Sequence, residues 1–218
     1  PFARARVCAV TRSLSAYGLA FSIRRHRDNP WTHPLFMKVK MINALGCGLM
    51  SFFIDGARTM LICGTRGSGK SAFLGSNLIE IMRRYRIITI EDTLELPTVF
   101  MRKLGFNILS MKVGSAVGGA SSSELSPADG IRASLRLGDS ALILGEVRSL
   151  ETLALYEAMR VGAAANVVAG TIHGDSPFGV FDRVVNDLGV PKTSFKATDI
   201  IVFVRPIRSA DGLHKLRR

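Results

Sequence analysis

The chain has 218 residues and is 47% apolar, which is enough to build a buried core and argues against a disordered chain. Lysine and arginine outnumber aspartate and glutamate by 29 to 17, and the formal charge of +12 favours an anionic partner: phosphate groups, nucleic acid or an acidic membrane surface. The 3 cysteines share no metal-ligand spacing, which favours a reduced, cytoplasmic protein.

A hairpin is expected at the start of the chain. Residues 6–10 and 19–23 are short β-favouring runs, separated by a segment that contains Ser and Gly. Because the chain begins with Pro1 rather than Met and stops in a basic run, we expect it to be a piece of a longer protein. Residues 1–28 are therefore predicted to be the end of an N-terminal domain.

A linker and a connecting helix are predicted over residues 29–56. The linker follows from a basic stretch that ends at a proline. Apolar residues then recur at helical spacing over residues 34–54, where Gly46 and Gly48 leave one helix or two equally open. The most apolar part, residues 41–54, is too short to span a bilayer, which needs roughly 20 apolar residues.

An α/β domain is predicted over residues 57–218, because apolar β-favouring runs alternate with helical patterns there. The expected strands cover residues 60–63, 87–90, 106–113, 141–144, 167–172 and 200–204. The expected helices cover residues 70–84, 127–137, 150–161 and 178–188. A run rich in Gly and Ser, residues 114–123, predicts a flexible surface loop. The alternation is typical of a mostly parallel sheet flanked by helices.

The strongest motif is a P-loop. Residues 64–71 match G-x-x-x-x-G-K-[ST], between an apolar run and a helical pattern as the motif requires. The glycines let the backbone curl so that successive amides point at an anion, and the helix that follows adds its positive end. In this arrangement Lys70 reaches the terminal phosphates and Ser71 offers its hydroxyl to Mg²⁺. The sequence therefore predicts that the protein binds and hydrolyses a nucleoside triphosphate.

Four expected strands end in residues suited to phosphate chemistry. The first runs into the P-loop, and the others run into Glu91 and Asp92, into Glu146, and into His173. The carboxyl ends of parallel strands share one edge, where open α/β sheets bind ligands. These polar groups are therefore expected to converge on the P-loop.

Each group has a candidate role at that edge. Glu146 is expected to hold Mg²⁺ or its water. Glu91, Asp92 and Glu95 are candidates to orient or deprotonate the attacking water, and Glu95 is preferred as the base. His173 is expected to sense the γ-phosphate through a hydrogen bond.

An arginine is expected to complete the site, because a bound triphosphate develops charge that one lysine does not neutralise. The candidates are Arg24, Arg132, Arg136, Arg148 and Arg160. Arg132 and Arg136 are four residues apart and share a helix face. The sequence leaves the choice among the five open.

These motifs resemble those of the type II/type IV secretion and pilus-assembly ATPases, most closely their archaeal branch. Residues 64–71 are similar to the Walker A motif of that family, and residues 90–96 to its acidic Asp box. Residues 142–148 resemble its atypical Walker B motif, in which Gly precedes the glutamate, and residues 170–174 resemble its His box. Upstream, residues 21–25 resemble the end of the family's N-terminal domain, where basic residues reach the nucleotide.

The resemblance implies a RecA-like motor domain that binds ATP and Mg²⁺. It implies catalytic roles for Lys70, Glu95, Glu146 and His173, with Glu95 as the activator of water. It implies metal ligation by Ser71, Glu146 and Glu91. It implies nucleotide contacts from Gly64, Thr65, Arg66, Gly67, Ser68, Gly69, Lys70, Ser71, Ala72 and Arg24.

The same resemblance implies a homo-oligomer, a ring hexamer, on the cytoplasmic face of a membrane machine. The expected partner is the inner-membrane platform protein of a secretion or pilus machine. One departure matters: much of the family has Gly-His before the His box, whereas Gly162 is followed here by Ala163. No role for that histidine is carried over.

Other functions remain open at this stage. The charge and the P-loop architecture also suit a nucleic-acid translocase, although the chain is only 7% aromatic and has no basic stripe interleaved with aromatics. A switch GTPase is disfavoured because no Asn-Lys-x-Asp motif is present. In a small-molecule kinase, Glu95 and Glu146 would serve a hydroxyl acceptor in place of water.

Overall fold

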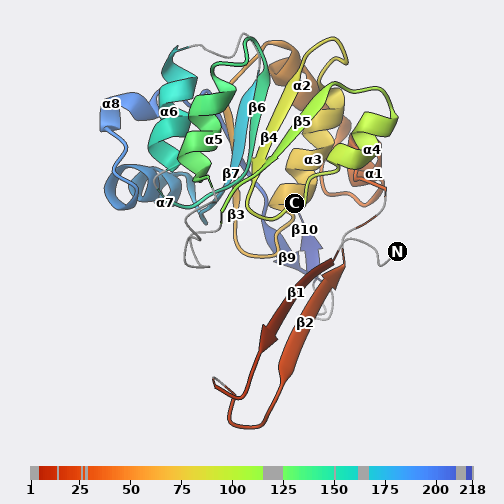
Figure 1. Ribbon diagram of the computed structural model, residues 1–218. Coiled ribbons are helices and arrows are strands. Elements are labelled where there is room, and N and C mark those ends of the chain that lie inside the picture. Colours follow the sequence, from red (N-terminus) through yellow and green to blue (C-terminus); the bar gives the residue numbers. More distant parts are fainter. Residues whose placement is uncertain are drawn as a thin grey trace.

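The computed structural model describes residues 5–13, 15–25, 27, 29–114, 125–149, 151–161, 167–209 and 215–217. A six-stranded sheet runs through the centre of the described α/β region (Figure 1). In spatial order its strands are β5 (Ile108–Lys112), β4 (Ile87–Glu91), β6 (Ala141–Val147), β7 (Val168–His173), β3 (Met60–Gly64) and β8 (Ile200–Phe203). Every neighbouring pair is parallel, so the carboxyl ends of all these strands lie at one edge.

Helices cover both faces of the sheet (Figure 1). One face carries α1 (His33–Lys38), α2 (Ala44–Asp55), α3 (Lys70–Glu80) and α4 (Thr98–Lys103). The other carries α5 (Pro127–Ser134), α6 (Glu151–Val161), α7 (Pro177–Asp182), the π-helical turn η1 (Arg183–Asp187) and α8 (Lys192–Phe195).

The buried core therefore has two layers, one on each side of the sheet. Strand β3 shows why: its side chains alternate between the faces, so Met60 and Ile62 join the layer under α2 and α3. Leu61 and Cys63 join the layer under α6. Strands buried on both faces read as continuous apolar runs, which is the pattern that the sequence shows.

The N-terminal hairpin is present as expected. Strand β1 (Ala5–Val10) pairs antiparallel with β2 (Ala20–Arg25), and the two extend away from the α/β region in Figure 1. A second hairpin, formed by β9 (Pro206–Arg208) and β10 (Lys215–Arg217), was not predicted. The division into an N-terminal domain, a linker and a motor domain at residues 28 and 56 stays a prediction.

The helical pattern of residues 34–54 is two helices, and the break does not fall at its glycines. It falls at residues 39–43, where Lys40 has a φ of 56° and the Asn43 side chain caps α2 by accepting the amide of Gly46 at 2.8 Å. Within the described part of the chain, no helix combines the length and the hydrophobicity that a membrane crossing needs.

Gly48 lies inside α2, and nothing would contact a Cβ added there. We therefore expect Gly48→Ala to stabilise the fold by about 0.5–1 kcal/mol, because alanine loses less backbone entropy in a helix. Thermal or urea unfolding measures the change. Gly46→Ala is the matched comparison, because its Cβ would lie 2.7 Å from the Ile42 side chain. If both substitutions destabilise the protein equally, the assignment of an open helical site at Gly48 is wrong.

Several predicted boundaries are corrected. Helix α3 ends at Glu80 instead of residue 84, because Ile81 turns to an extended conformation that buries its side chain in the core. Helix α5 ends at Ser134 instead of residue 137. The predicted helix 178–188 is α7 followed by a π-helical turn, and α4 and α8 were missed. Residues 115–124, which hold nearly all of the predicted Gly and Ser loop, lie outside the described residues.

Candidate functional site

The P-loop joins β3 to α3 and has the expected shape. Gly64, Gly67 and Gly69 have φ angles of 157°, 74° and 106°, which L side chains rarely adopt. A Cβ on Gly64 would lie only 2.3 Å from the carbonyl oxygen of Val204. Gly69 occupies the N-cap of α3 and offers no side-chain oxygen to the helix. The amides of the first turn of α3 therefore remain available to an anion.

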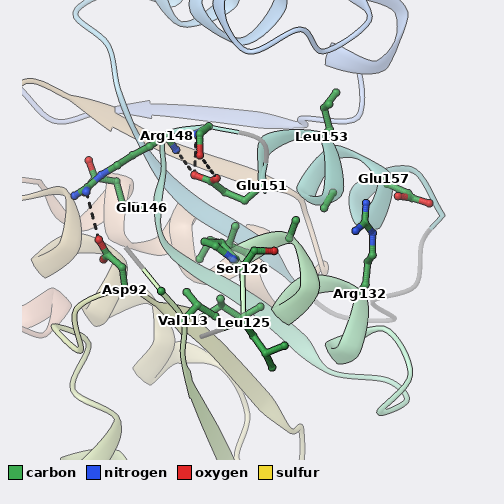
Figure 2. Close-up of a pocket in the computed structure, with 17 residues that line it drawn as sticks. Asp92, Val113, Leu125, Ser126, Arg132, Glu146, Arg148, Glu151, Leu153 and Glu157 are labelled. Atoms are coloured by element: carbon green, nitrogen blue, oxygen red, sulfur yellow. Dashed lines mark hydrogen bonds and ion pairs between the residues drawn. The ribbon is translucent and has the colours of Figure 1, made fainter. Parts of the chain in front are cut away.

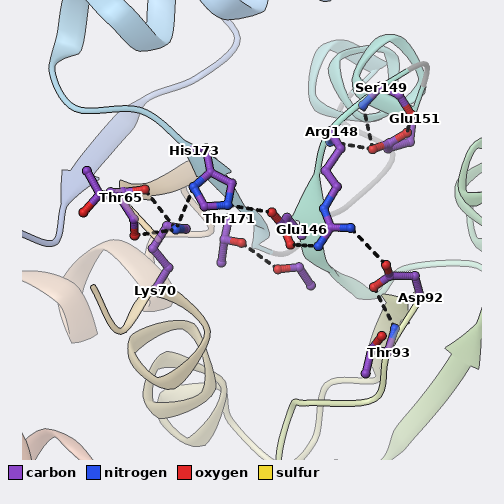
Figure 3. Close-up of polar contacts among 12 residues, drawn as sticks. Thr65, Lys70, Asp92, Thr93, Glu146, Arg148, Ser149, Glu151, Thr171 and His173 are labelled. Atoms are coloured by element: carbon purple, nitrogen blue, oxygen red, sulfur yellow. Dashed lines mark hydrogen bonds and ion pairs between the residues drawn. The ribbon is translucent and has the colours of Figure 1, made fainter. Parts of the chain in front are cut away.

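Lys70 is folded back onto the P-loop (Figure 3). Its Nζ donates hydrogen bonds to the carbonyl oxygens of Gly64 at 2.9 Å and Thr65 at 3.0 Å. Burial lowers the pKa of Lys70, and the carboxylate of Glu146 opposes that shift. The side chain is only 7% exposed, so it presents a desolvated charge to the place where phosphates would bind.

His173, at the end of β7, connects Lys70 to Glu146. Its Nδ1 lies 3.3 Å from Nζ of Lys70, and its Nε2 lies 3.0 Å from Oε1 of Glu146 (Figure 3). Burial and the charge of Lys70 lower the pKa of His173. A neutral ring that accepts from the lysine at Nδ1 carries its hydrogen on Nε2, facing the carboxylate.

Glu146 lies between Arg148 and His173. Its Oε2 pairs with the guanidinium of Arg148, which also lies 3.3 Å from Oδ2 of Asp92 (Figure 3). Burial alone would raise the pKa of Glu146. The hydrogen bond and charge of Arg148, with the charges of His173 and Lys70, outweigh burial and lower it. Glu146 is therefore ionised at neutral pH, as a metal ligand must be.

Glu91 is 3% exposed and holds the loop after β4. Its Oε1 accepts the amides of Glu95 at 2.8 Å and Leu96 at 2.9 Å. Burial raises the pKa of Glu91 to about 7, although the two amide hydrogen bonds oppose the shift. The contacts make Glu91 a positioning residue for Glu95, and its predicted role as a metal ligand stays a prediction.

This raised pKa makes the stability of the fold depend on pH. The folded state keeps the Glu91 proton better than the unfolded state does, so the free energy of unfolding falls as pH rises from about 4.5 to about 7. We expect Glu91→Gln to remove this fall, so that the variant gains stability relative to the parent between pH 5 and pH 8. Urea unfolding at both pH values measures it, with the exposed Glu157→Gln as control. A difference that does not change with pH would contradict the burial argument.

Most of the predicted residues surround one cavity of about 380 Å³ at the carboxyl edge of the sheet, whereas Glu91 and Asp92 line a smaller cavity that shares Glu95 and Glu146 with it. It is lined by Arg24, Arg66, Gly67, Gly69, Lys70, Ser71, Ala72, Glu95, Glu146, Arg148, Thr171, His173 and Arg183. The convergence expected from the strand ends is therefore present. Gly64 and Thr65 contribute carbonyl oxygens to Lys70, whereas Ser68 is fully buried and shapes the loop.

The arginines divide into two groups. Arg24, from the N-terminal hairpin, and Arg148 line the cavity. Arg132 instead pairs with Asp129 at 3.5 Å on α5, and Arg160 donates to Ser194. Arg136 is exposed near the end of α5. These last three are therefore not suited to act on a nucleotide in the same subunit.

Arg183 was missed by the sequence analysis. It lies in the π-helical turn η1, lines the cavity, and helps to lower the pKa of His173. Its Nε is buried without a hydrogen-bond partner among the residues that the structure describes. No motif marks this position. The sequence feature that could have indicated Arg183 is its position in a helix predicted shortly after His173.

A second cavity, of about 520 Å³, lies between α5 and α6 (Figure 2). Apolar residues such as Leu125, Val113 and Leu153 line most of it. Asp92, Glu146 and Arg148 form part of its polar wall, and Arg148 and Glu146 line both cavities.

Comparison with known proteins places this site in context. Residues 15–211 match the model of the family described as type II/IV secretion system protein. The chain is 33% identical over 131 residues to protein VirB11 of Agrobacterium fabrum, covering 60% of this chain and 36% of that protein. It is 31% identical over 132 residues to type II secretion system protein E of Aeromonas hydrophila, covering 60% and 23%. The chain thus spans about a third or less of the length of these curated relatives.

Solved structures share the fold. The Legionella pneumophila ATPase DotB superposes with a TM-score of 0.69 at 16% identity, over 98% of this chain and 56% of that one. The pilus retraction motor PilT with bound ADP gives a TM-score of 0.62 at 22% identity, over 98% and 58%. The RecA-like α/β fold expected from the sequence is therefore confirmed. An uncharacterised protein of the archaeon Methanocaldococcus jannaschii is 28% identical over 189 residues, covering 84% of this chain and 25% of that protein, and the archaeal assignment stays a prediction.

Proposed function

This chain belongs to the type II/IV secretion system protein family, and we propose that it is the motor domain of an ATPase that powers protein secretion or pilus assembly. The observation that carries the proposal is the shared cavity, into which the P-loop, Glu95, Glu146 and His173 converge from separate elements. The nucleic-acid alternative is not favoured by the type II secretion protein and the pilus retraction motor among the similar proteins.

ATP would bind with its phosphates on the P-loop. The first-turn amides of α3 and the charge of Lys70 face that position, and Lys70 needs only to leave two carbonyl oxygens to reach a phosphate. Glu95 lies in the same cavity and would accept the proton of the attacking water. His173 would sense the γ-phosphate and transmit its presence to Glu146 through the Nε2–H.

Mg²⁺ fits the oxygen donors present. Ser71 and Glu146 line the cavity together, and both supply the hard oxygen ligands that this ion prefers. No cluster of three or more His, Cys, Asp or Glu side chains forms a metal cage within the described part of the chain. That agrees with an ion held by one carboxylate, one hydroxyl and the phosphates, where it would neutralise the charge on the transferred group.

ATP hydrolysis would result in a movement of the N-terminal hairpin. Arg24 reaches the cavity from β2, so the hairpin and the domain that it ends would follow the loss of a phosphate. We propose that the motor works as a ring hexamer, in the cytoplasm at the membrane, on an inner-membrane platform protein.

The dependence of ATP turnover on the oligomeric state of the protein tests this proposal. Phosphate release from ATP by the intact protein should require Mg²⁺ and should rise with the fraction of protein in the ring, as determined by sedimentation. Undiminished turnover in a strictly monomeric protein would overturn the ring. Absence of ATP hydrolysis at every protein concentration would overturn the motor function.

A further inference from the structure

Arg148 joins acids that belong to two different strands. Its guanidinium contacts Glu146, within β6, and lies 3.3 Å from Asp92, directly after β4. The three side chains are 34%, 21% and 25% exposed for Arg148, Glu146 and Asp92, so these charges are shielded from much of the solvent. One cation is therefore shared between a proposed metal ligand and the loop that carries Glu95.

The backbone of Arg148 is fixed, whereas its side chain has room to move. The buried Glu151 accepts the amides of Arg148 at 2.6 Å and Ser149 at 2.9 Å. The side chain lines both the nucleotide cavity and the cavity of about 520 Å³, which is the one drawn in Figure 2. A shift of the guanidinium from one acid toward the other therefore needs no movement of the chain.

Asp92 is built to pass such a shift on to Glu95. Its Oδ1 accepts the amide of Thr93 at 2.7 Å, while its Oδ2 faces Arg148. Glu91 fixes the far end of the same loop through the amides of Glu95 and Leu96. Holding Asp92 more firmly would therefore restrain the short segment between two anchored ends.

We propose that Arg148 is a positioning residue that couples metal binding at Glu146 to the order of the loop carrying Glu95. Without the metal, Arg148 occupies Glu146. A metal cation at Glu146 competes with the guanidinium, which then pairs fully with Asp92 and steadies residues 92–96. This inference rests on the proposed function, because it takes Glu146 as a metal ligand.

Metal affinity tests the coupling directly. Mn²⁺ is titrated into the intact protein with a non-hydrolysable ATP analogue, and free Mn²⁺ is measured by electron paramagnetic resonance. Arg148→Met removes the competing cation, so Mn²⁺ should bind roughly five-fold tighter while ATP turnover falls. Asp92→Asn leaves Arg148 on Glu146 alone, so Mn²⁺ should bind roughly two- to five-fold weaker. Arg102→Met, at an exposed arginine of α4, is the matched control and should leave both quantities unchanged.

Hydrogen exchange supplies the second measurement. In the parent, adding Mn²⁺ should slow exchange of the amides in residues 92–96, and in Arg148→Met it should not. Mn²⁺ affinity that falls or stays equal in Arg148→Met overturns the coupling. A shift of Asp92→Asn in the same direction as Arg148→Met overturns it as well, even if one variant folds poorly. If the parent itself binds no Mn²⁺ with the nucleotide, the proposed metal site fails instead.

Discussion

Lys70→Ala should reduce ATP hydrolysis by about 100-fold or more in the intact protein. The ammonium of Lys70 lies in a nearly dry position, between two P-loop carbonyl oxygens and His173. A charge in such a place interacts more strongly with developing phosphate charge than a solvated one does. Truncation also removes the partner of His173 at Nδ1, so the hydrogen on Nε2 is no longer directed at Glu146.

The loss of ATP hydrolysis in Lys70→Ala must be distinguished from unfolding of the variant. Lys112→Ala is a suitable control, because Lys112 is an exposed lysine at the carboxyl end of β5, on the same edge of the sheet. Steady-state phosphate release should be unchanged in this variant. Lys70→Met keeps the buried volume of the side chain and should be as inactive as Lys70→Ala, with a melting temperature near that of the parent. Normal ATP hydrolysis by Lys70→Ala would refute the central assignment.

The sequence predicts the P-loop, β3 and the start of α3 well, because motif and apolar pattern agree there. It also predicts that Glu146 and His173 meet, because parallel strands bring their carboxyl ends to one edge. The side-chain contacts that connect these residues are harder to predict from the sequence. The contacts of Arg148 with Asp92 and of Lys70 with His173 span 56 and 103 residues, and no local spacing encodes such pairs.

Arg183 shows a second kind of limit. A π-helical turn inserts an extra residue into the helical path, so side chains beyond it point elsewhere than an α-helix would place them. Such turns form where tertiary packing favours them, and the helical pattern of residues 178–188 does not reveal one. Glu91 shows another limit, because no local pattern reveals that its buried carboxylate accepts the amides of Glu95 and Leu96.

Glu146→Gln should lower turnover by about 100-fold while nucleotide still binds in the absence of metal. The substitution keeps the size of the side chain but removes the charge that Arg148, His173 and Lys70 surround. Glutamine is a weak Mg²⁺ ligand, so the Mg²⁺ concentration needed for half-maximal turnover should rise. Glu157→Gln, on the exposed side of α6, is the matched control.

Glu95→Gln separates the two acidic roles. If Glu95 is the base, its amide variant should lose turnover with no change in the Mg²⁺ requirement, since glutamine accepts no proton from water. Glu146→Gln should change both quantities. The measurement is turnover as a function of Mg²⁺ concentration at saturating ATP. Because Glu91 fixes the amide of residue 95 in either variant, a change in loop position does not account for the difference. A raised Mg²⁺ requirement in Glu95→Gln alone would exchange the two assignments.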